Sequence, residues 1–257
     1  MTEASAILAL AHRDFIKLLR DRQRIVADFA FPLIFIGILG TSLQAGFGAQ
    51  AGGLNLLDYV FTGVLAQTVW QSSALGLISL LADREQDFSQ EIFVSPISRY
   101  SIILGKILGE SVVALPQALG IIAFGFILQI HMGSDQLARM VLALLVIALF
   151  GGAFGVIVLA NLSSQRAANQ IFPFVMLPQF FLAGIFNPIQ NLPLPLDILS
   201  HLAPMRYAVD LLRDAYYGST SGVVVSNATT NLLIIGVLFV VFMVVGTFLF
   251  VRAERNR

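Results

Sequence analysis

The sequence predicts an all-α polytopic membrane protein with six transmembrane helices, an N-terminal amphipathic interfacial helix and short external re-entrant helices before the last span. Three observations support this fold class. Of the 257 residues, 57% are hydrophobic and only 12% are charged, against roughly 25% charged in soluble domains. The apolar residues gather in runs long enough to cross a bilayer. The positive charges gather at alternate gaps between those runs.

A bilayer core about 30 Å thick needs roughly 20 apolar residues per helix. Six runs approach that length, and together they make residues 1–257 a single transmembrane domain. The expected spans are Ile25 to Leu43, Tyr59 to Leu81, Ile102 to Ile130, Leu137 to Leu159, Ile171 to Pro188 and Leu232 to Val251.

Residues 1–24 form the expected amphipathic helix. Leu8, Phe15 and Leu19 share one face, while charged residues such as Lys17 and Asp21 occupy the other. This pattern is typical of a helix that lies along a membrane surface. The charges follow a short apolar run with no cleavage site, so the segment does not resemble a signal peptide.

Lysine and arginine placement predicts the orientation. The larger set falls on one side of the six predicted spans: Arg13, Lys17, Arg20, Arg22, Arg24, Arg84, Arg99, Lys106, Arg166, Arg252, Arg255 and Arg257. The smaller set falls on the other side: Arg139, Arg206 and Arg213. The positive-inside rule therefore predicts that both termini, the loop 83–100 and the loop 161–170 are cytoplasmic, and that 188–228 is external.

Composition also narrows the chemistry. The chain has no cysteine, which excludes disulfides and thiolate metal sites, and its three histidines show no metal-ligand spacing. A formal net charge of zero gives no indication of a nucleic-acid partner. Gly105-Lys106 is not a phosphate-binding loop, because Ile107 follows the lysine. We expect no catalytic residues, no metal and no cofactor bound by this chain.

Polar residues inside the predicted spans are candidates for function. Gln67 and Gln71 lie one helical turn apart beside Trp70, and buried amides in lipid must find partners. Helix packing and substrate contact both remain open for them. Lys106 and Glu110 have the i,i+4 spacing of an ion pair, and ionisable groups near membrane depth are costly. We therefore expect this pair to have a structural or gating role.

The fifth predicted span contains Pro173 and Pro178 and is expected to be a kinked helix that stops at about Asn187. Two short helical patterns, LDILSHL and MRYAVDLLRDAYYG, follow it within residues 188–228. In the second, Arg206 and Asp210 have i,i+4 spacing and are expected to pair.

Two separated segments then resemble one known family. Asp83 to Lys106 reads DREQDFSQEIFVSPISRYSIILGK, similar to the cytoplasmic loop of ABC transporter type 2 permeases, in which a charged helix leads through Ser-Pro-x-Ser-Arg to a Gly-Lys opening the third span. LAGIFNPIQNLP and APMRYAVDLLRDAYYG resemble that family's fifth span, external turn and short external helices. With six spans and the N-terminal helix, the resemblance covers nearly the whole chain.

The resemblance implies a non-catalytic subunit of an exporter in a bacterial or archaeal inner membrane, surrounded by membrane lipids. It would pair with a second permease subunit, identical or not, and with separate ATP-binding subunits that hold ATP and Mg. The residues expected to couple to the ATPase are Arg84, Glu85, Asp87, Phe88, Glu91, Phe93, Ser95, Pro96 and Arg99. The residues expected along the substrate path are Gln67, Trp70, Gln71, Met176, Phe180 and Phe181.

A path walled by Phe and Met favours an amphipathic drug-like or lipid-like cargo. The first span lacks the Arg-Tyr-rich entry and tryptophan of polysaccharide exporters of this family, although a polysaccharide or glycolipid exporter remains the alternative. An importer permease is less favoured because no Glu-Ala-Ala-x-x-x-Gly loop is present. A secondary transporter is less favoured because no internal repeat is evident. A non-transporting membrane scaffold is the remaining possibility.

Overall fold

The computed structural model describes residues 12–13, 15–16, 20, 22–48, 53–79, 81, 99–160, 162, 164–190, 192–219 and 221–255. Within these residues the protein is helical and contains no strand. The elements are α2 (Arg22–Ile34), the π-helix η1 (Phe35–Gly40), α3 (Thr41–Phe47), α4 (Leu56–Gly76), α7 (Arg99–Ile127), α8 (Ser134–Leu159), α9 (Gln165–Leu182), α10 (Leu194–Leu202), α11 (Pro204–Tyr217) and α12 (Ala228–Arg255).

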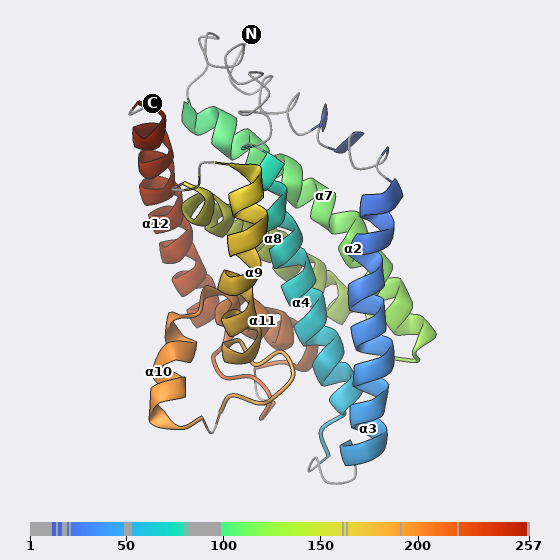
Figure 1. The fold of residues 1–257 in the computed structure, drawn as a ribbon. Coiled ribbons are helices and arrows are strands. Elements are labelled where there is room, and N and C mark those ends of the chain that lie inside the picture. Colours follow the sequence, from blue (N-terminus) through green and yellow to red (C-terminus); the bar gives the residue numbers. More distant parts are fainter. Residues whose placement is uncertain are drawn as a thin grey trace.

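Helix α4 is the centre of the bundle, in contact with α7, α8, α11 and η1 (Figure 1). The side chain of Asn55 caps it by accepting hydrogen bonds from the backbone N–H groups of Leu57 and Asp58. Every residue from Tyr59 to Trp70 is buried, so the helix is covered on all sides by protein.

Two glycines let α8 approach α4 closely. A Cβ at Gly151 would lie 2.2 Å from the carbonyl oxygen of Trp70, and one at Gly155 would lie 2.6 Å from that of Ala74. Gly151 and Gly155 are four residues apart, the small-xxx-small spacing that brings helix backbones together in membranes. Any larger side chain at either position would push the two helices apart.

The apolar character of the helices agrees only in part with six spans. Among the described residues, four helical segments are long and apolar enough to cross a membrane: Asp28–Phe47, Ile103–Ile127, Ser134–Leu159 and Ala228–Phe250. The predicted second and fifth spans correspond to α4 and α9, which belong to the same bundle but lie outside this set. Helix α4 is less apolar because it contains several polar side chains. They are tolerated because they face other helices rather than acyl chains.

The first predicted span is not one regular helix. It corresponds to α2, η1 and α3 in succession, with Pro32 inside α2 three residues before the π-helix begins. Proline removes one backbone N–H, and single turns of π-helix often occur where a helix departs from regular hydrogen bonding.

Helix α9 begins and ends earlier than the sequence predicts. It starts at Gln165, inside the expected loop 161–170, because Ser164 caps it by accepting a hydrogen bond from the N–H of Ala167. It ends at Leu182 rather than near Asn187, and Gly184 follows with a φ of +71°, a left-handed conformation that favours glycine.

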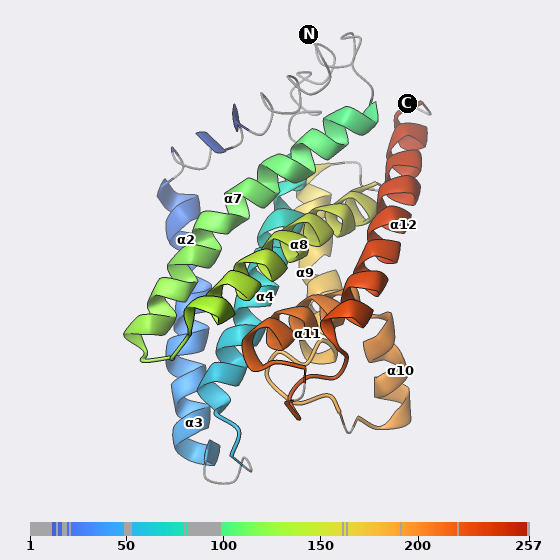
Figure 2. The same ribbon diagram turned by 180° about the vertical axis from the view of Figure 1, so that it is seen from behind.

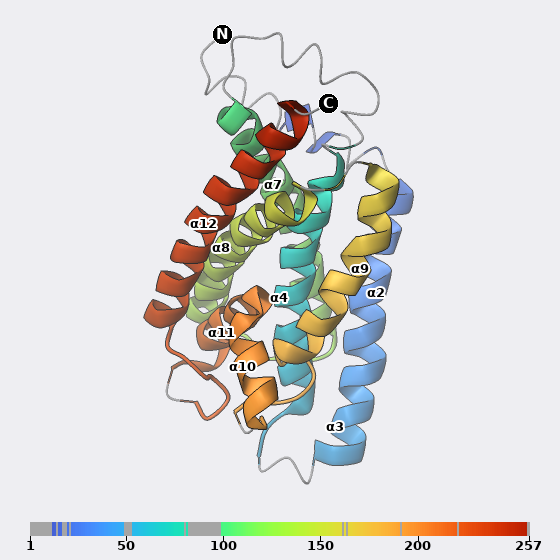
Figure 3. The same ribbon diagram turned by 60° about the vertical axis from the view of Figure 1, so that its left-hand side comes forward.

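The two ends of the bundle differ. Figure 2 shows the start of α7 beside the end of α12 at one end, while α3, α10 and α11 lie at the other. Figure 3 shows α9 descending toward α10 and α11. The two short patterns predicted in 188–228 are α10 and α11, and Gly218, with a φ of +82°, follows the last residue of α11. Re-entry of α10 and α11 into the bilayer stays a prediction.

Candidate functional site

Lys106 and Glu110 form a buried ion pair near the start of α7. The Lys106 Nζ lies 3.1 Å from Glu110 Oε1, and each side chain is only 2% exposed. Gly76, at the end of α4, lies against the carboxylate, since a Cβ there would be 2.0 Å from Glu110 Oε2. The two residues whose spacing predicts an ion pair thus form one, and the pair lies against the end of α4.

The predicted coupling residues fall mostly outside the described part of the chain. Arg84, Glu85, Asp87, Phe88, Glu91, Phe93, Ser95 and Pro96 all lie within 82–98, and the N-terminal amphipathic helix lies largely outside as well. Arg99 is the first residue of α7. The chain from this loop therefore enters α7 two turns before the Lys106–Glu110 pair.

A polar recess, lined by Asp28, Gln67, Thr68, Gln71 and Gln117 among others, lies between α2, α4 and α7 and has a volume of about 130 Å³. The amide of Gln67 donates a hydrogen bond to Gln71 Oε1, four residues along α4. Thr68 Oγ1 and Gln117 Oε1 are buried and have no hydrogen-bond partner in the described part of the chain. Unpartnered polar atoms at this depth are costly. The recess can therefore accept hydrogen bonds from a polar group of a ligand.

Gln117 supplies a hydrogen bond that the proline of α2 cannot make. Pro32 lacks the N–H that would donate to the carbonyl oxygen of Asp28, four residues earlier. Gln117 Nε2 donates to that oxygen instead, at 2.6 Å. A helix defect in α2 is thereby compensated by a side chain of α7, and the two helices are joined by that hydrogen bond.

The six predicted path residues do not form one site within the protomer. Only Gln67 and Gln71 lie in the polar recess. Trp70 packs on α8, with its ring centroid 4.5 Å from that of Phe154. On α9, Met176 is buried and Phe180 is half-buried, whereas Phe181 is 62% exposed.

Arg213 of α11 is the most deeply enclosed cation at the opposite end of the bundle. Its guanidinium carbon lies 3.7 Å from the centroid of the Tyr59 ring. Its Nη2 donates to the carbonyl oxygens of Gly184 at 2.8 Å and of Ile185 at 3.3 Å. Burial lowers the pKa of this guanidinium. The contacts join α4, α11 and the turn that ends α9.

The predicted Arg206–Asp210 pair does not form, although both residues are described. Asp210 instead accepts hydrogen bonds from the backbone N–H groups of Val225 at 2.9 Å and Ser226 at 2.7 Å. Arg206 Nη1 donates to Ser200 Oγ at 2.8 Å and lies 3.6 Å from Asp197 Oδ1. Each charge has a closer partner in another segment, which the i,i+4 spacing does not reveal.

Sequence reasoning missed several of these residues. Gln117 follows Pro116 in an otherwise apolar span, and an amide in that position could have been predicted to hydrogen-bond another helix. Gly151 and Gly155 carried the small-xxx-small spacing. Arg213 had no such signal, because its partners Tyr59 and Gly184 are far away in sequence.

Comparison with known proteins agrees with this architecture. The family described as ABC-2 type transporter matches residues 5–217, most of the chain. The chain belongs to the ABC-2 type transporter family. It is therefore a multi-pass membrane protein and the permease of an ABC transporter, and the family implies association with an ABC ATP-binding subunit.

Individual relatives carry different names. The chain is 27% identical over 217 residues to the transport permease ycf38 of Cyanophora paradoxa, covering 83% of this chain and 75% of that one. It is 28% identical over 159 residues to the "Probable multidrug ABC transporter permease YbhR" of Escherichia coli K12, covering 62% and 43%. It is 24% identical over 204 residues to Nodulation protein J of Rhizobium meliloti strain 1021, covering 76% and 74%.

Proposed function

We propose that this ABC-2 permease exports an amphipathic drug-like or lipid-like substrate from the cytoplasm or inner leaflet. The family match carries the proposal, and the named multidrug relative favours this cargo. A polysaccharide or glycolipid cargo is the alternative. The matched segment covers less than half of the multidrug relative, so its cargo comes to this chain only as part of the proposal.

In this proposal, energy comes from ATP and Mg on two separate ATP-binding subunits. They dock on the cytoplasmic loop 83–100 of each of two permease subunits, and both termini face the cytoplasm. Complementary charges, among them Arg84 and Glu91, fix the register of the loop helix on the ATPase. The permease itself performs no hydrolysis.

In this proposal the movement passes from the loop through α7 to α4. Force on the loop reaches α7 at Arg99, and α7 bears on the end of α4 through Glu110 and Gly76. Helix α4 carries Gln67 and Gln71, and its displacement changes the shape of the polar recess. The recess accepts the polar part of the substrate, and exposed aromatic side chains of α9 such as Phe181 contact its apolar part at a separate point of the path.

Co-purification and vesicle transport test this function together. Inside-out vesicles that contain the permease and its ATP-binding subunit should accumulate the amphipathic dye rhodamine 6G only when ATP is supplied. Replacing Glu91→Arg together with Arg84→Glu should abolish both subunit association and dye uptake. Arg166→Gln, a charge change on an exposed position of α9, serves as the matched control and should leave both intact.

Two results would contradict parts of the proposal. Full association and dye uptake in the doubly reversed variant would remove the docking role of the loop. ATP-driven uptake of a labelled glycolipid with no uptake of dye would replace the drug-like cargo with the alternative.

A further inference from the structure

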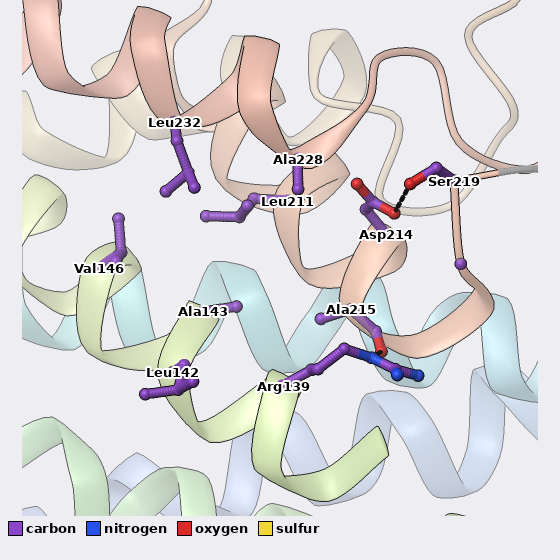
Figure 4. A pocket seen from close by; sticks show the side chains of 11 residues that line it. Arg139, Leu142, Ala143, Val146, Leu211, Asp214, Ala215, Ser219, Ala228 and Leu232 are labelled. Atoms are coloured by element: carbon purple, nitrogen blue, oxygen red, sulfur yellow. Dashed lines mark hydrogen bonds between the residues drawn. The ribbon is translucent and has the colours of Figure 1, made fainter. Parts of the chain in front are cut away.

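A second pocket lies at the α11 end of the bundle, between α8, α11 and the start of α12 (Figure 4). Its volume of about 470 Å³ falls within the range of small-molecule sites. It is separate from the polar recess and from all the residues proposed above for transport. Its polar lining residues are Arg139, Asp214 and Ser219, and its larger apolar ones are Leu142, Val146 and Leu232.

The polar part of the pocket contains a carboxylate that is only half satisfied. Asp214 is 6% exposed, and its Oδ1 accepts a hydrogen bond from Ser219 Oγ at 2.7 Å. Its Oδ2 has no hydrogen-bond partner among the residues that the structure describes. Figure 4 shows this second oxygen turned toward Ala228, a residue of the pocket wall. A buried carboxylate oxygen left in this state favours any occupant that donates a hydrogen bond to it.

A cation lies in the same pocket without neutralising Asp214. Arg139 Nε donates to the carbonyl oxygen of Ala215 at 3.3 Å, and no ion pair joins Arg139 to Asp214. Arg139 is an exposed residue, and four of the five N–H groups of its guanidinium are not used in that bond. The pocket is thus lined by an anion on α11 and a cation on α8.

The apolar part lies deeper along the same helices. Val146 is seven residues beyond Arg139 on α8, about 10 Å along the axis. Leu142 is 64% exposed and Leu232 is 44% exposed, so the pocket opens sideways on two helices apolar enough to span a membrane. Arg139 near the start of α8 and apolar residues farther along it follow the order of head group and acyl chain in a bilayer leaflet.

We propose that this pocket holds a bilayer phospholipid with an ethanolamine head group. The ammonium donates to the carboxylate of Asp214, the phosphate accepts from Arg139, and an acyl chain lies along Leu142, Val146 and Leu232. Because Oδ2 is covered, the carboxylate turns about its hydrogen bond from Ser219 to meet the amine. A primary ammonium has three donors, whereas the trimethylammonium of a choline lipid has none, so the site discriminates between these head groups.

Lipid retention tests the proposal without any transport measurement. The purified permease is equilibrated with equal amounts of phosphatidylethanolamine, phosphatidylcholine and phosphatidylglycerol of identical chains, and the retained lipid is measured by native mass spectrometry. We expect ethanolamine lipid to be enriched at least fivefold over choline lipid. Asp214→Asn, which keeps the shape of the side chain, should reduce the enrichment to below twofold.

Two further variants separate lipid binding from misfolding. Asp135→Asn removes an exposed acid from the first turn of α8 outside the pocket, and it should leave the enrichment unchanged. Ala143→Phe should fill the pocket and displace the lipid without changing any charge. Equal retention of all three lipids would overturn the proposal, and so would preferential retention of phosphatidylglycerol or an unchanged profile in Ala143→Phe.

Discussion

Two glycines of α4 each lie beside a buried charged side chain, and the two charges are satisfied in different ways. At one end, Gly76 lies against Glu110, which pairs with Lys106 of the same helix. In the N-terminal half of α4, a Cβ at Gly63 would lie 3.1 Å from Nη2 of Arg213. Arg213 has neutral partners there, namely backbone carbonyls and the face of the Tyr59 ring.

The difference concerns which substitutions each site can tolerate. An ion pair needs opposite charges at two positions, and either order of acid and base can supply them. Carbonyl oxygens and an aromatic face need a cation that keeps its charge and its flat shape when fully desolvated, which favours Arg over Lys. The first site therefore depends on charge balance, and the second depends on the identity of one side chain.

The largest expected effect breaks the charge balance at the first site. Glu110→Lys leaves two buried cations together and should cost about 3 kcal/mol or more of stability, because removing one partner of a buried pair strands the other. The combined Lys106→Glu and Glu110→Lys variant should recover at least half of that loss. Thermal unfolding of the purified protein in detergent measures both. A double variant no more stable than Glu110→Lys would contradict an ion-pair role.

A smaller effect is expected from Arg213→Lys at the second site. The shorter lysine cannot stack a flat cation on Tyr59, and it gives up its proton more readily when buried. At least one carbonyl then loses its donor, at a cost of about 2 kcal/mol. The same unfolding measurement applies, with Arg166→Lys at an exposed position of α9 as the control. Equal unfolding temperatures for Arg213→Lys and this control would remove the distinction between the sites.

The smallest effect is expected at a hydrogen bond between two uncharged groups, the amide of Gln117 and the carbonyl of Asp28. Gln117→Leu should cost about 1 kcal/mol, because the Asp28 carbonyl loses its donor while Pro32 cannot replace it. In a Pro32→Ala background the restored N–H takes that oxygen, so the same substitution should cost less. Pro178→Ala, at another proline inside a helix, is the matched background and should leave the cost of Gln117→Leu unchanged. A double-mutant cycle with no coupling between 32 and 117 would refute the compensation.

Two pairs with the same spacing show how far sequence reasoning reaches. Lys106 and Glu110 are four residues apart and form an ion pair. Arg206 and Asp210 are also four residues apart, yet Asp210 accepts from the backbone at Val225 and Ser226. Helical spacing makes a pair possible, but segments brought near by the fold compete for the same charges.

The sequence by itself determined the membrane class, the positions of most helices, the Lys106–Glu110 pair and the family resemblance. These features follow from composition and from contacts within one helical turn. Only the tertiary structure placed α4 at the centre, gave Gln117 the carbonyl of Asp28 and enclosed Arg213 among carbonyls. Each of those depends on residues distant in sequence, whose proximity is set by the packing of whole helices rather than by any local pattern.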